Sequence, residues 1–252
     1  MSYSPPVVLT FAASDPTGGA GLQADILAIA ALGCHPVSVV TALTVQDTHG
    51  VSGMHAVETD LVVAQAQRLL ADMPIAAFKT GVLGSPENIA AIAALLSAYP
   101  KVPLVADPVL ASGRGDTLTS DAGLAAMKEK IIPLATVATP NSVEAQRLGG
   151  ASRLLALGCR FVLVTGTNAD TPDVVNTLYD ASGVAREDRW PRLPGSYHGS
   201  GCTLASAIAA SMAKGQDVNQ ASRAAQEYTW KSLAAGFRPG AGQLIPHRLF
   251  AH

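Results

Sequence analysis

Residues 7–31 read VVLTFAASDPTGGAGLQADILAIAA. The apolar run Val7–Ala12 predicts a strand, and the Ala- and Leu-rich run Leu22–Ala31 predicts a helix. Between them lies a polar loop in which Asp15 is the one charged residue and Gly19 is one of three glycines. Glycines let a backbone approach a ligand closely. The stretch therefore predicts the first β-then-α unit of an α/β fold, with a loop suited to binding at the junction.

The same alternation continues along the chain. Apolar strands separated by helices favour a mostly parallel sheet covered on both faces, which binds ligands at the carboxyl ends of its strands. The polar, glycine-punctuated stretch Thr44–Glu58 interrupts the pattern, and we expect a small β flap there, near the sheet edge. The other predicted strands are Val37–Leu43, Ala76–Thr80, Leu104–Asp107, Thr136–Thr139, Phe161–Thr165 and Val174–Tyr179, and the other predicted helices are Leu61–Leu70, Glu87–Leu96, Ala122–Ile132, Ser200–Ala213 and Gln220–Ala234.

Composition narrows the class of protein. Of 252 residues, 48% are hydrophobic and 14% charged, so the chain has the apolar material for a large core, and with no linker in sight we expect one domain over residues 1–252. A net charge of −2 gives no basic field for nucleic acid, and no run is long and apolar enough to span a membrane. Three cysteines without CxxC spacing predict a reducing compartment and no zinc site. We expect a cytoplasmic protein with a small-molecule ligand.

A second glycine-rich turn predicts an anion site. His198-Gly199-Ser200-Gly201-Cys202-Thr203 runs directly into the predicted helix Ser200–Ala213. Exposed amide groups and the positive end of the helix dipole suit the charge that develops on a transferred phosphoryl group. The same field predicts a lowered pKa for the Cys202 thiol, as a base or a nucleophile, whereas Cys34 and Cys159 lie in apolar contexts.

Polar residues follow three of the predicted strands. Asp107 and Glu144 are carboxylates at strand ends, and Mg²⁺ prefers one or two carboxylates together with substrate phosphates. A second interpretation stays open, in which Asn141 is only a helix N-cap and Glu144 its capping-box partner. Gln46 follows a buried strand, and its amide can both donate to and accept from a ring that carries an amino group beside a ring nitrogen.

Two common nucleotide motifs do not account for the chain. Residues 19–24 match GxGxxG/A, but the loop before Gly19 is long and no acidic residue ends a second strand near Val40, which disfavours a nicotinamide dinucleotide site. No GxxxxGK[ST] sequence occurs, so any ATP must be held without a Walker loop.

Taken together, the motifs resemble one family closely, in the same order over nearly the whole chain. They are DPTGGAGLQAD at 15–25, Thr41-Ala42-Leu43 with Gln46, Thr139-Pro140-Asn141 with Glu144, and HGSGCT at 198–203. The family is the hydroxymethylpyrimidine and phosphomethylpyrimidine kinases of thiamine biosynthesis. The resemblance implies a ribokinase-like fold, which is a three-layer αβα sandwich with a mostly parallel central sheet, and a kinase that uses ATP and Mg²⁺.

The resemblance also implies a role for individual residues. Gln46 would bind the pyrimidine, Asp15 and Gly19 would line the acceptor pocket, and Val82 and Val109 would flank the ring. The remaining implied roles are an anion hole at Gly199, Ser200 and Gly201, a catalytic base at Cys202, Mg²⁺ at Asp107 and Glu144, and nucleotide contacts at Asn141, Thr165, Gly166 and Lys231. Members of this kind phosphorylate the alcohol and then its monophosphate, and a homodimer is a further expectation.

One departure from the family pattern bears on the second phosphorylation. Family members commonly carry Lys-Ser-Gly-Asp after the Asp-Pro-Val strand end. This chain reads ASGRGD at 111–116, so the usual Lys is absent and Arg114 is the nearby residue that could supply its positive charge. Arg and Lys are not interchangeable at close phosphate contacts. A pyridoxal kinase is the nearest rival enzyme, and a non-catalytic pyrimidine-binding protein is the rival of another class.

Overall fold

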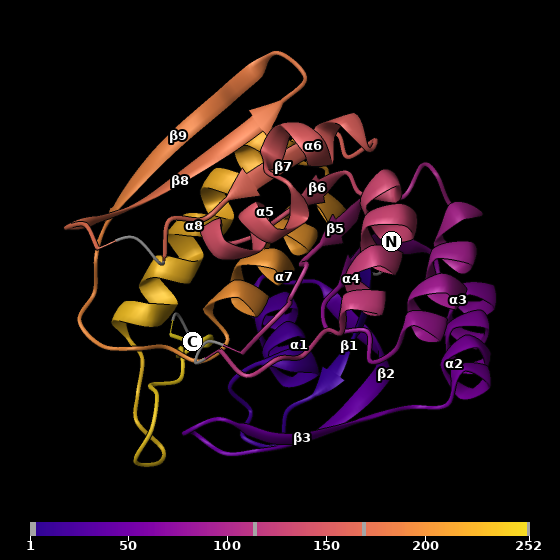
Figure 1. Cartoon of the computed structure of the whole chain (residues 1–252), viewed down its shortest axis with the longest axis horizontal. Helices are drawn as coiled ribbons and strands as arrows, with labels where there is room; N and C mark the ends of the chain where they lie inside the picture. The colour runs from indigo at the N-terminus through magenta and orange to yellow at the C-terminus, as the bar shows by residue number, and fades with distance from the viewer. Residues whose placement is uncertain (1–3, 113–114, 168–169, 251–252) are drawn as a thin grey trace.

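A nine-stranded sheet runs through the part of the chain that the computed structural model describes, residues 4–112, 115–167 and 170–250 (Figure 1). Its strand order is β3-β2-β1-β4-β5-β6-β7-β8-β9. The six central strands pair in parallel. They are β1 (Val7–Ser14), β2 (His35–Gln46), β4 (Ile75–Thr80), β5 (Leu104–Ala106), β6 (Val137–Ala138) and β7 (Phe161–Val164).

Antiparallel strands form both edges of the sheet. At one edge β3 (Val51–Ala56) folds back on β2, which confirms the predicted β flap. At the other edge β8 (Asp173–Asp180) and β9 (Gly183–Pro191) extend as a ribbon beyond the body of the molecule (Figure 1). The sequence did not predict β9, because its residues are mostly polar and largely exposed and give no apolar run.

Helices cover both faces, as the α/β prediction requires. One face is covered by α1 (Gly21–Ala31), α7 (Ser200–Ala213) and α8 (Val218–Ala234). The opposite face is covered by α2 (Thr59–Asp72), α3 (Pro86–Ser97), α4 (Asp121–Ala126), α5 (Ser142–Leu148) and α6 (Ala151–Ala156).

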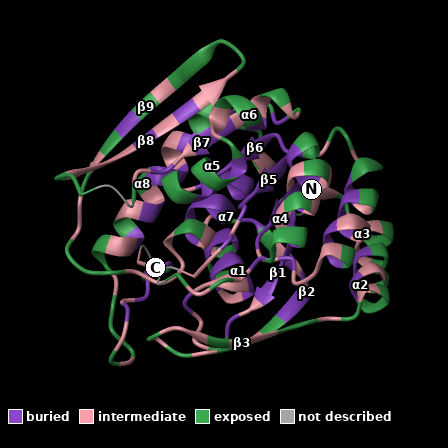
Figure 2. Ribbon diagram, viewed as in Figure 1, coloured by how far each residue is buried: buried purple, intermediate pink, exposed green. Residues whose placement is uncertain are grey.

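Neighbouring strand residues supply two separate cores. Val8 of β1 packs under α7 with Ile208, whereas the next residue, Leu9, packs on the other face with Ile92. Side chains alternate between the faces of a strand, so a strand buried on both faces reads as one continuous apolar run. Figure 2 shows this burial concentrated along the central strands and α7.

One predicted helix is built differently from the expectation. The run Ala122–Ile132 begins as α4, continues as a π-helical turn over Met127–Ile131, and ends in a 3-10 turn at Ile132–Leu134. The π-helical turn buries Met127 and Ile131. Pro133, which lies just past the predicted end, lacks the amide that a continuing helix needs. Within the described residues, no helix combines the length and the apolar character that crossing a membrane demands.

Candidate active site

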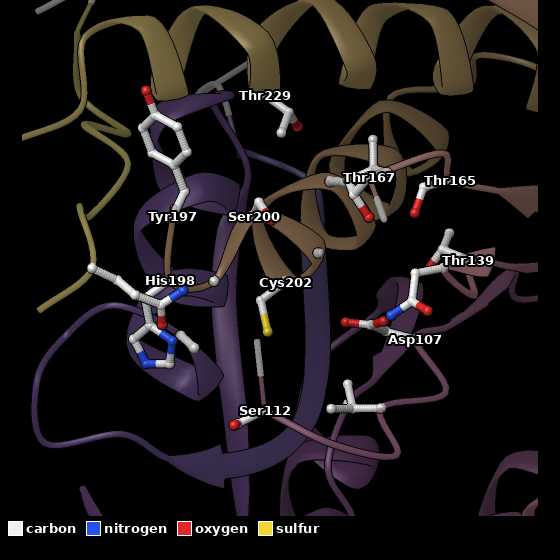
Figure 3. A pocket seen from close by; sticks show the side chains of 18 of the residues that line it. Asp107, Ser112, Thr139, Thr165, Thr167, Tyr197, His198, Ser200, Cys202 and Thr229 are labelled. Atoms are coloured by element: carbon white, nitrogen blue, oxygen red, sulfur yellow. The ribbon is translucent and has the colours of Figure 1, made fainter. Parts of the chain in front are cut away.

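A cavity of about 410 Å³ opens where the parallel strands end (Figure 3). This is the position that a parallel sheet predicts for a ligand. The cavity brings together most of the residues that the motifs singled out, which come from elements and loops along nearly the whole chain. Those that line it are Asp15, Gln46, Val82, Asp107, Val109, Asn141, Glu144, Thr165, Gly199, Ser200, Gly201 and Cys202.

Asp15 organises the loop between β1 and α1. Its carboxylate is 1% exposed and accepts hydrogen bonds from the Thr17 amide at 2.8 Å and the Ala20 amide at 2.7 Å. His198 Nε2 lies 2.8 Å from Asp15 Oδ2. Burial alone would raise the pKa of Asp15, but the hydrogen bonds from His198, Thr17 and Ala20 hold it below its ordinary value. Asp15 therefore links the first glycine turn to the second while it lines the cavity.

The two glycine turns touch through their backbones. Gly199 has φ +80°, and a Cβ there would lie 1.9 Å from the Gly19 carbonyl oxygen, so no other residue fits. Gly19 is buried in this contact and does not itself line the cavity, in contrast to its predicted role in the acceptor pocket. Its function here is to let the two turns approach each other.

The second turn presents the start of α7 to the cavity. No side chain of the described residues caps α7 at Gly199, which leaves the first amide groups of the helix for a ligand. The helix dipole adds positive potential at the same point. This geometry agrees with the predicted anion hole at Gly199, Ser200 and Gly201.

The structure corrects the expected pKa of Cys202. The thiol points into the cavity, toward the region that the Asp107 carboxylate also faces (Figure 3). Burial raises the pKa of Cys202 to about 12, and the charges of Asp107 and Asp25 add to this, although Lys79 opposes it. The helix terminus was expected to lower this pKa, but the burial and the two neighbouring carboxylates outweigh it.

A buried ion pair lies beneath the cavity, and the sequence did not predict it. Lys79 Nζ lies 2.9 and 3.0 Å from the two oxygens of Asp25, and both side chains are 0% exposed. Ser206 and Thr10 donate to the same carboxylate at 2.7 and 2.6 Å. Asp25 and Cys202 hold the pKa of Lys79 above its ordinary value although burial alone would lower it. The signal was present, since Lys79 interrupts the apolar run of β4.

Glu144 forms the capping box that was one of its two interpretations. Its Oε2 accepts from the Asn141 amide at 2.9 Å, while Asn141 Oδ1 accepts from the amides of Val143 and Glu144 at 3.0 and 2.9 Å. Its Oε1 accepts from the Leu110 amide at 3.2 Å. Burial, with the charge of Asp107, raises the pKa of Glu144 to about 7. Glu144 thus holds the loops after β5 and β6 together.

The surroundings of Asp107 fit a cation. Among the described residues its Oδ2 is buried without a hydrogen-bond partner, and so is Oγ1 of Thr139. Burial raises the pKa of Asp107 to about 6, against the opposing charge of Lys79. Within the described part of the chain, no three metal-binding side chains gather. Two carboxylates completed by phosphate oxygens and water would suit Mg²⁺, so the residues fit that ion.

Gln46 lies at the end of the cavity that β1, β2 and β4 form. Its Nε2 donates to Thr44 Oγ1 at 2.6 Å, and Thr44 donates to the Ser14 carbonyl oxygen at 2.9 Å. This orientation leaves Gln46 Oε1 and the second amide proton for a ligand. Val82 and Val109 line the same cavity. Gly113 and Arg114, where the usual Lys is missing, lie outside the described residues.

The opposite end of the cavity lies between β7, β8 and α8. Asn141 and Thr165 form an isolated parallel β-bridge there, and the Gly166 amide donates to Asn176 Oδ1 at 3.1 Å. Asn176 and Trp190 both donate to Gln226 Oε1, at 2.9 and 3.0 Å. The sequence did not predict this buried network, because its members come from three separate elements, β8, β9 and α8.

Lys231 is not among the residues that line the cavity, and its predicted contact with the nucleotide stays a prediction. It is exposed, and its Nζ bonds to Glu227 at 2.6 Å. Gln226, Thr229, Trp230 and Leu233 of the same helix line the cavity instead. They repeat at the spacing of one helix face, and Lys231 lies about 100° around the helix from Trp230.

Comparisons with known proteins agree on one kind of chain. The family model described as phosphomethylpyrimidine kinase matches residues 15–247. A Streptomyces coelicolor protein named hydroxymethylpyrimidine/phosphomethylpyrimidine kinase is 42% identical, over 95% of this chain and 93% of its own. A Geobacter sulfurreducens thiamine biosynthesis bifunctional protein is 41% identical, over 88% of this chain and 48% of its own.

Solved structures share the fold. An ADP complex of Bacillus subtilis pyridoxal kinase has a TM-score of 0.90 at 27% identity and covers 97% of this chain and 98% of its own. A phosphomethylpyrimidine kinase from Clostridium difficile has a TM-score of 0.79 at 32% identity and covers 90% of this chain and 99% of its own. The predicted fold class is confirmed.

Proposed function

The chain belongs to the phosphomethylpyrimidine kinase family, as its motifs predicted, and on that premise we propose that it transfers the γ-phosphoryl group of ATP to 4-amino-5-hydroxymethyl-2-methylpyrimidine and then to the resulting monophosphate. It is a kinase. One observation supports the reaction best: the uncapped start of α7 and the Cys202 thiol line the same cavity as Gln46 and the buried carboxylates of Asp107 and Glu144.

The acceptor would lie at the end formed by β1, β2 and β4. There the amide of Gln46 would pair with the amino group and ring nitrogen of the pyrimidine, while Val82 and Val109 would pack on the ring. Asp15 shapes the loop beneath. Such an arrangement would aim the hydroxymethyl group at the start of α7, and positioning of this kind is the main contribution of a kinase to phosphoryl transfer.

ATP would lie along the rest of the cavity, with its phosphates between Asn141, Thr165 and the α7 amides. The amides would stabilise the charge that develops on the transferred phosphoryl group. Asp107 and Glu144 would hold Mg²⁺, which supplies neutralising charge on the phosphate oxygens when bound. Lys231 is not part of this proposal.

Cys202 would take the proton of the acceptor hydroxyl. The thiol must first release its own proton to water in the cavity, and burial opposes this ionisation while the charge of Lys79 favours it. Transfer would be direct and in line, with no phosphorylated cysteine. A phosphocysteine that accumulates with ATP alone, seen by rapid-quench mass spectrometry, would replace this with a two-step mechanism.

The structural likeness to pyridoxal kinases supports pyridoxal as a second candidate acceptor. A coupled assay of ADP release, with the pyrimidine alcohol, its monophosphate and pyridoxal supplied separately, tests all three. We expect the highest kcat/KM with the pyrimidine alcohol, and formation of the diphosphate from the monophosphate. Turnover of pyridoxal and of neither pyrimidine would refute the pyrimidine assignment, and a parallel preparation from cells that lack the gene controls for contaminating kinases.

We further propose that residues 1–252 act as one kinase domain, which the continuous sheet supports. A homodimer and a cytoplasmic location remain predictions. Sedimentation of the purified protein tests the homodimer, and fractionation of cells that express the protein tests the location.

A further inference from the structure

The C-terminal segment, defined as residues 243–248, returns to the second glycine turn. The His198 amide donates to the Leu244 carbonyl oxygen at 2.8 Å, and the Leu244 amide donates to the Ser196 carbonyl oxygen at 2.9 Å. Tyr228 of α8 donates to the Arg248 carbonyl oxygen at 2.7 Å. The segment is therefore fixed on one side to the residues that lead into α7, and on the other to α8.

Arg248 ends this segment with a buried guanidinium. The residue is 3% exposed, although Arg is almost never buried unless its donors are satisfied. Its Nε donates to Thr203 Oγ1 at 2.9 Å, and Thr203 in turn donates to the Gly199 carbonyl oxygen at 2.8 Å. Its terminal nitrogens donate to the carbonyl oxygens of Gly18 at 3.4 Å, of Gly19, and of Gly199 at 3.4 Å. One side chain thus holds carbonyl groups from both glycine turns.

The peptide group carries this constraint to the cavity. A trans peptide is planar, and its N–H points opposite to its C=O. When the carbonyl of Gly199 is held toward Arg248, the amide of Ser200 in the same peptide plane must point the other way. That amide is the first of the uncapped groups at the start of α7. The carbonyl of Gly19 fixes the Ala20 amide in the same manner, and this amide donates to Asp15.

From these contacts we propose that Arg248 is a positioning residue for phosphoryl transfer, which locks the two glycine turns together so that the α7 amides face the transferred group. The proposal rests on the proposed function. The planar guanidinium of Arg248 is suited to this role, because one group donates to three carbonyl oxygens and a hydroxyl. Lys has a single point charge on a flexible stem and cannot reproduce that pattern.

The decisive test compares Arg248→Lys with the wild-type protein by calorimetry. The probes are ADP with Mg²⁺, and the same mixture with aluminium fluoride, which mimics the phosphoryl group in flight. We expect ADP affinity to change less than about threefold and the extra affinity gained from aluminium fluoride to fall by roughly tenfold or more. kcat should fall by a similar factor, with a smaller change in KM. Arg238→Lys, on an exposed arginine that also donates to backbone carbonyls, is the matched control and should behave as wild type.

A purely structural role predicts a lower melting temperature with an unchanged ratio of the two affinities, and that result would overturn the proposal. If Arg248→Lys does not fold, Thr203→Val removes only the hydroxyl that receives Nε and should shift the ratio in the same direction by a smaller factor; an unchanged ratio there refutes the proposal equally. The calorimetric ratio needs no acceptor. Failure of the wild type to phosphorylate the pyrimidine would therefore contradict the proposed function and still leave the role of Arg248 decided.

Discussion

The Lys79–Asp25 pair offers the sharpest test of what holds the floor of the site. Lys79→Met removes one partner with little change in volume, Asp25→Leu removes the other while it keeps the branched shape with larger terminal groups, and each leaves the remaining charge buried at 0% exposure. Breaking a buried pair from one side costs about 3–5 kcal/mol. Since domains are stable by only about 5–15 kcal/mol, each single variant should lose a large share of its stability.

The double variant should cost less than the sum of the two single variants. No charge is left unpaired in it, and the remaining penalty is that of the Ser206 and Thr10 hydroxyls, each about 1–3 kcal/mol when left without a partner. The two single variants together should cost about 6–10 kcal/mol and the double variant about 2–6 kcal/mol, so the midpoints give a coupling free energy of about 4 kcal/mol between the two sites.

Urea unfolding followed by both circular dichroism and tryptophan fluorescence measures all four proteins. Lys231→Met, which breaks the exposed Lys231–Glu227 pair, is the control and should cost no more than about 1 kcal/mol. The pKa of Lys79 is raised in the fold, so the contribution of the pair should be complete at neutral pH and be lost only as strong alkali deprotonates the lysine. Strictly additive costs, or single costs below about 1 kcal/mol, would refute the reasoning.

Four further predictions concern the cavity. Gln46→Leu should weaken binding of the pyrimidine by about 1–3 kcal/mol in calorimetry and leave ATP affinity unchanged, and an unaltered pyrimidine affinity would remove Gln46 from the pocket. The Mg²⁺ concentration for half-maximal turnover should fall as pH rises from about 5.5 to 7.5, because Asp107 and Glu144, with pKa values of about 6 and 7, must lose their protons to bind a cation. Glu144→Gln should raise the Mg²⁺ concentration required and confine its pH dependence to the lower part of that range. If this variant instead shows the wild-type Mg²⁺ dependence and a lowered melting temperature, Glu144 is only a helix cap. Without Mg²⁺ the same raised pKa values should make the fold less stable as pH rises from about 4.5 to 7, since the unfolded chain loses these protons first, and thermal melts at each pH check the sign. Cys202→Ala should lower kcat by about 10² to 10⁴ with nearly unchanged KM, and the rise of wild-type kcat with pH above 7 should be absent in Cys202→Asp; full activity of Cys202→Ala would leave the backbone amides as the catalyst.

Local sequence patterns predicted most of the fold. The predicted strand Val37–Leu43 lies within β2, and the predicted helix Ser200–Ala213 has the same bounds as α7. Both could be predicted because the burial of a strand or helix determines which consecutive residues are apolar. A small β flap was predicted from the glycines and polar residues of Thr44–Glu58, and the structure adds that β3 there pairs antiparallel with β2. β9 was not predicted, because it buries little of its own surface and, within the described residues, pairs only with β8.

The site was predicted as a set of positions and not as a set of interactions. Strand ends and glycine turns are local, and so they could be found in the sequence. The link from Arg248 to Gly19 and the pairing of Lys79 with Asp25 join residues far apart in the chain. No local pattern identifies the two partners, although Lys79 itself stands out as a charge within an apolar strand. The direction of the Cys202 pKa was wrong for the same reason, since it depends on how deeply the thiol is buried and on Asp107 across the cavity.

The order of strands in the sheet has an evolutionary consequence. From β1 and β4 onward the strands follow one another across the sheet nearly in the order in which they are encoded. Gln46 and Val82 therefore belong to the first third of the gene, whereas Gln226 belongs to the last. Recombination near the codon for Pro100 would exchange Gln46 and Val82 while conserving Val109 and the residues proposed to hold the nucleotide, so the preference for an acceptor could change by replacement of one contiguous piece of DNA.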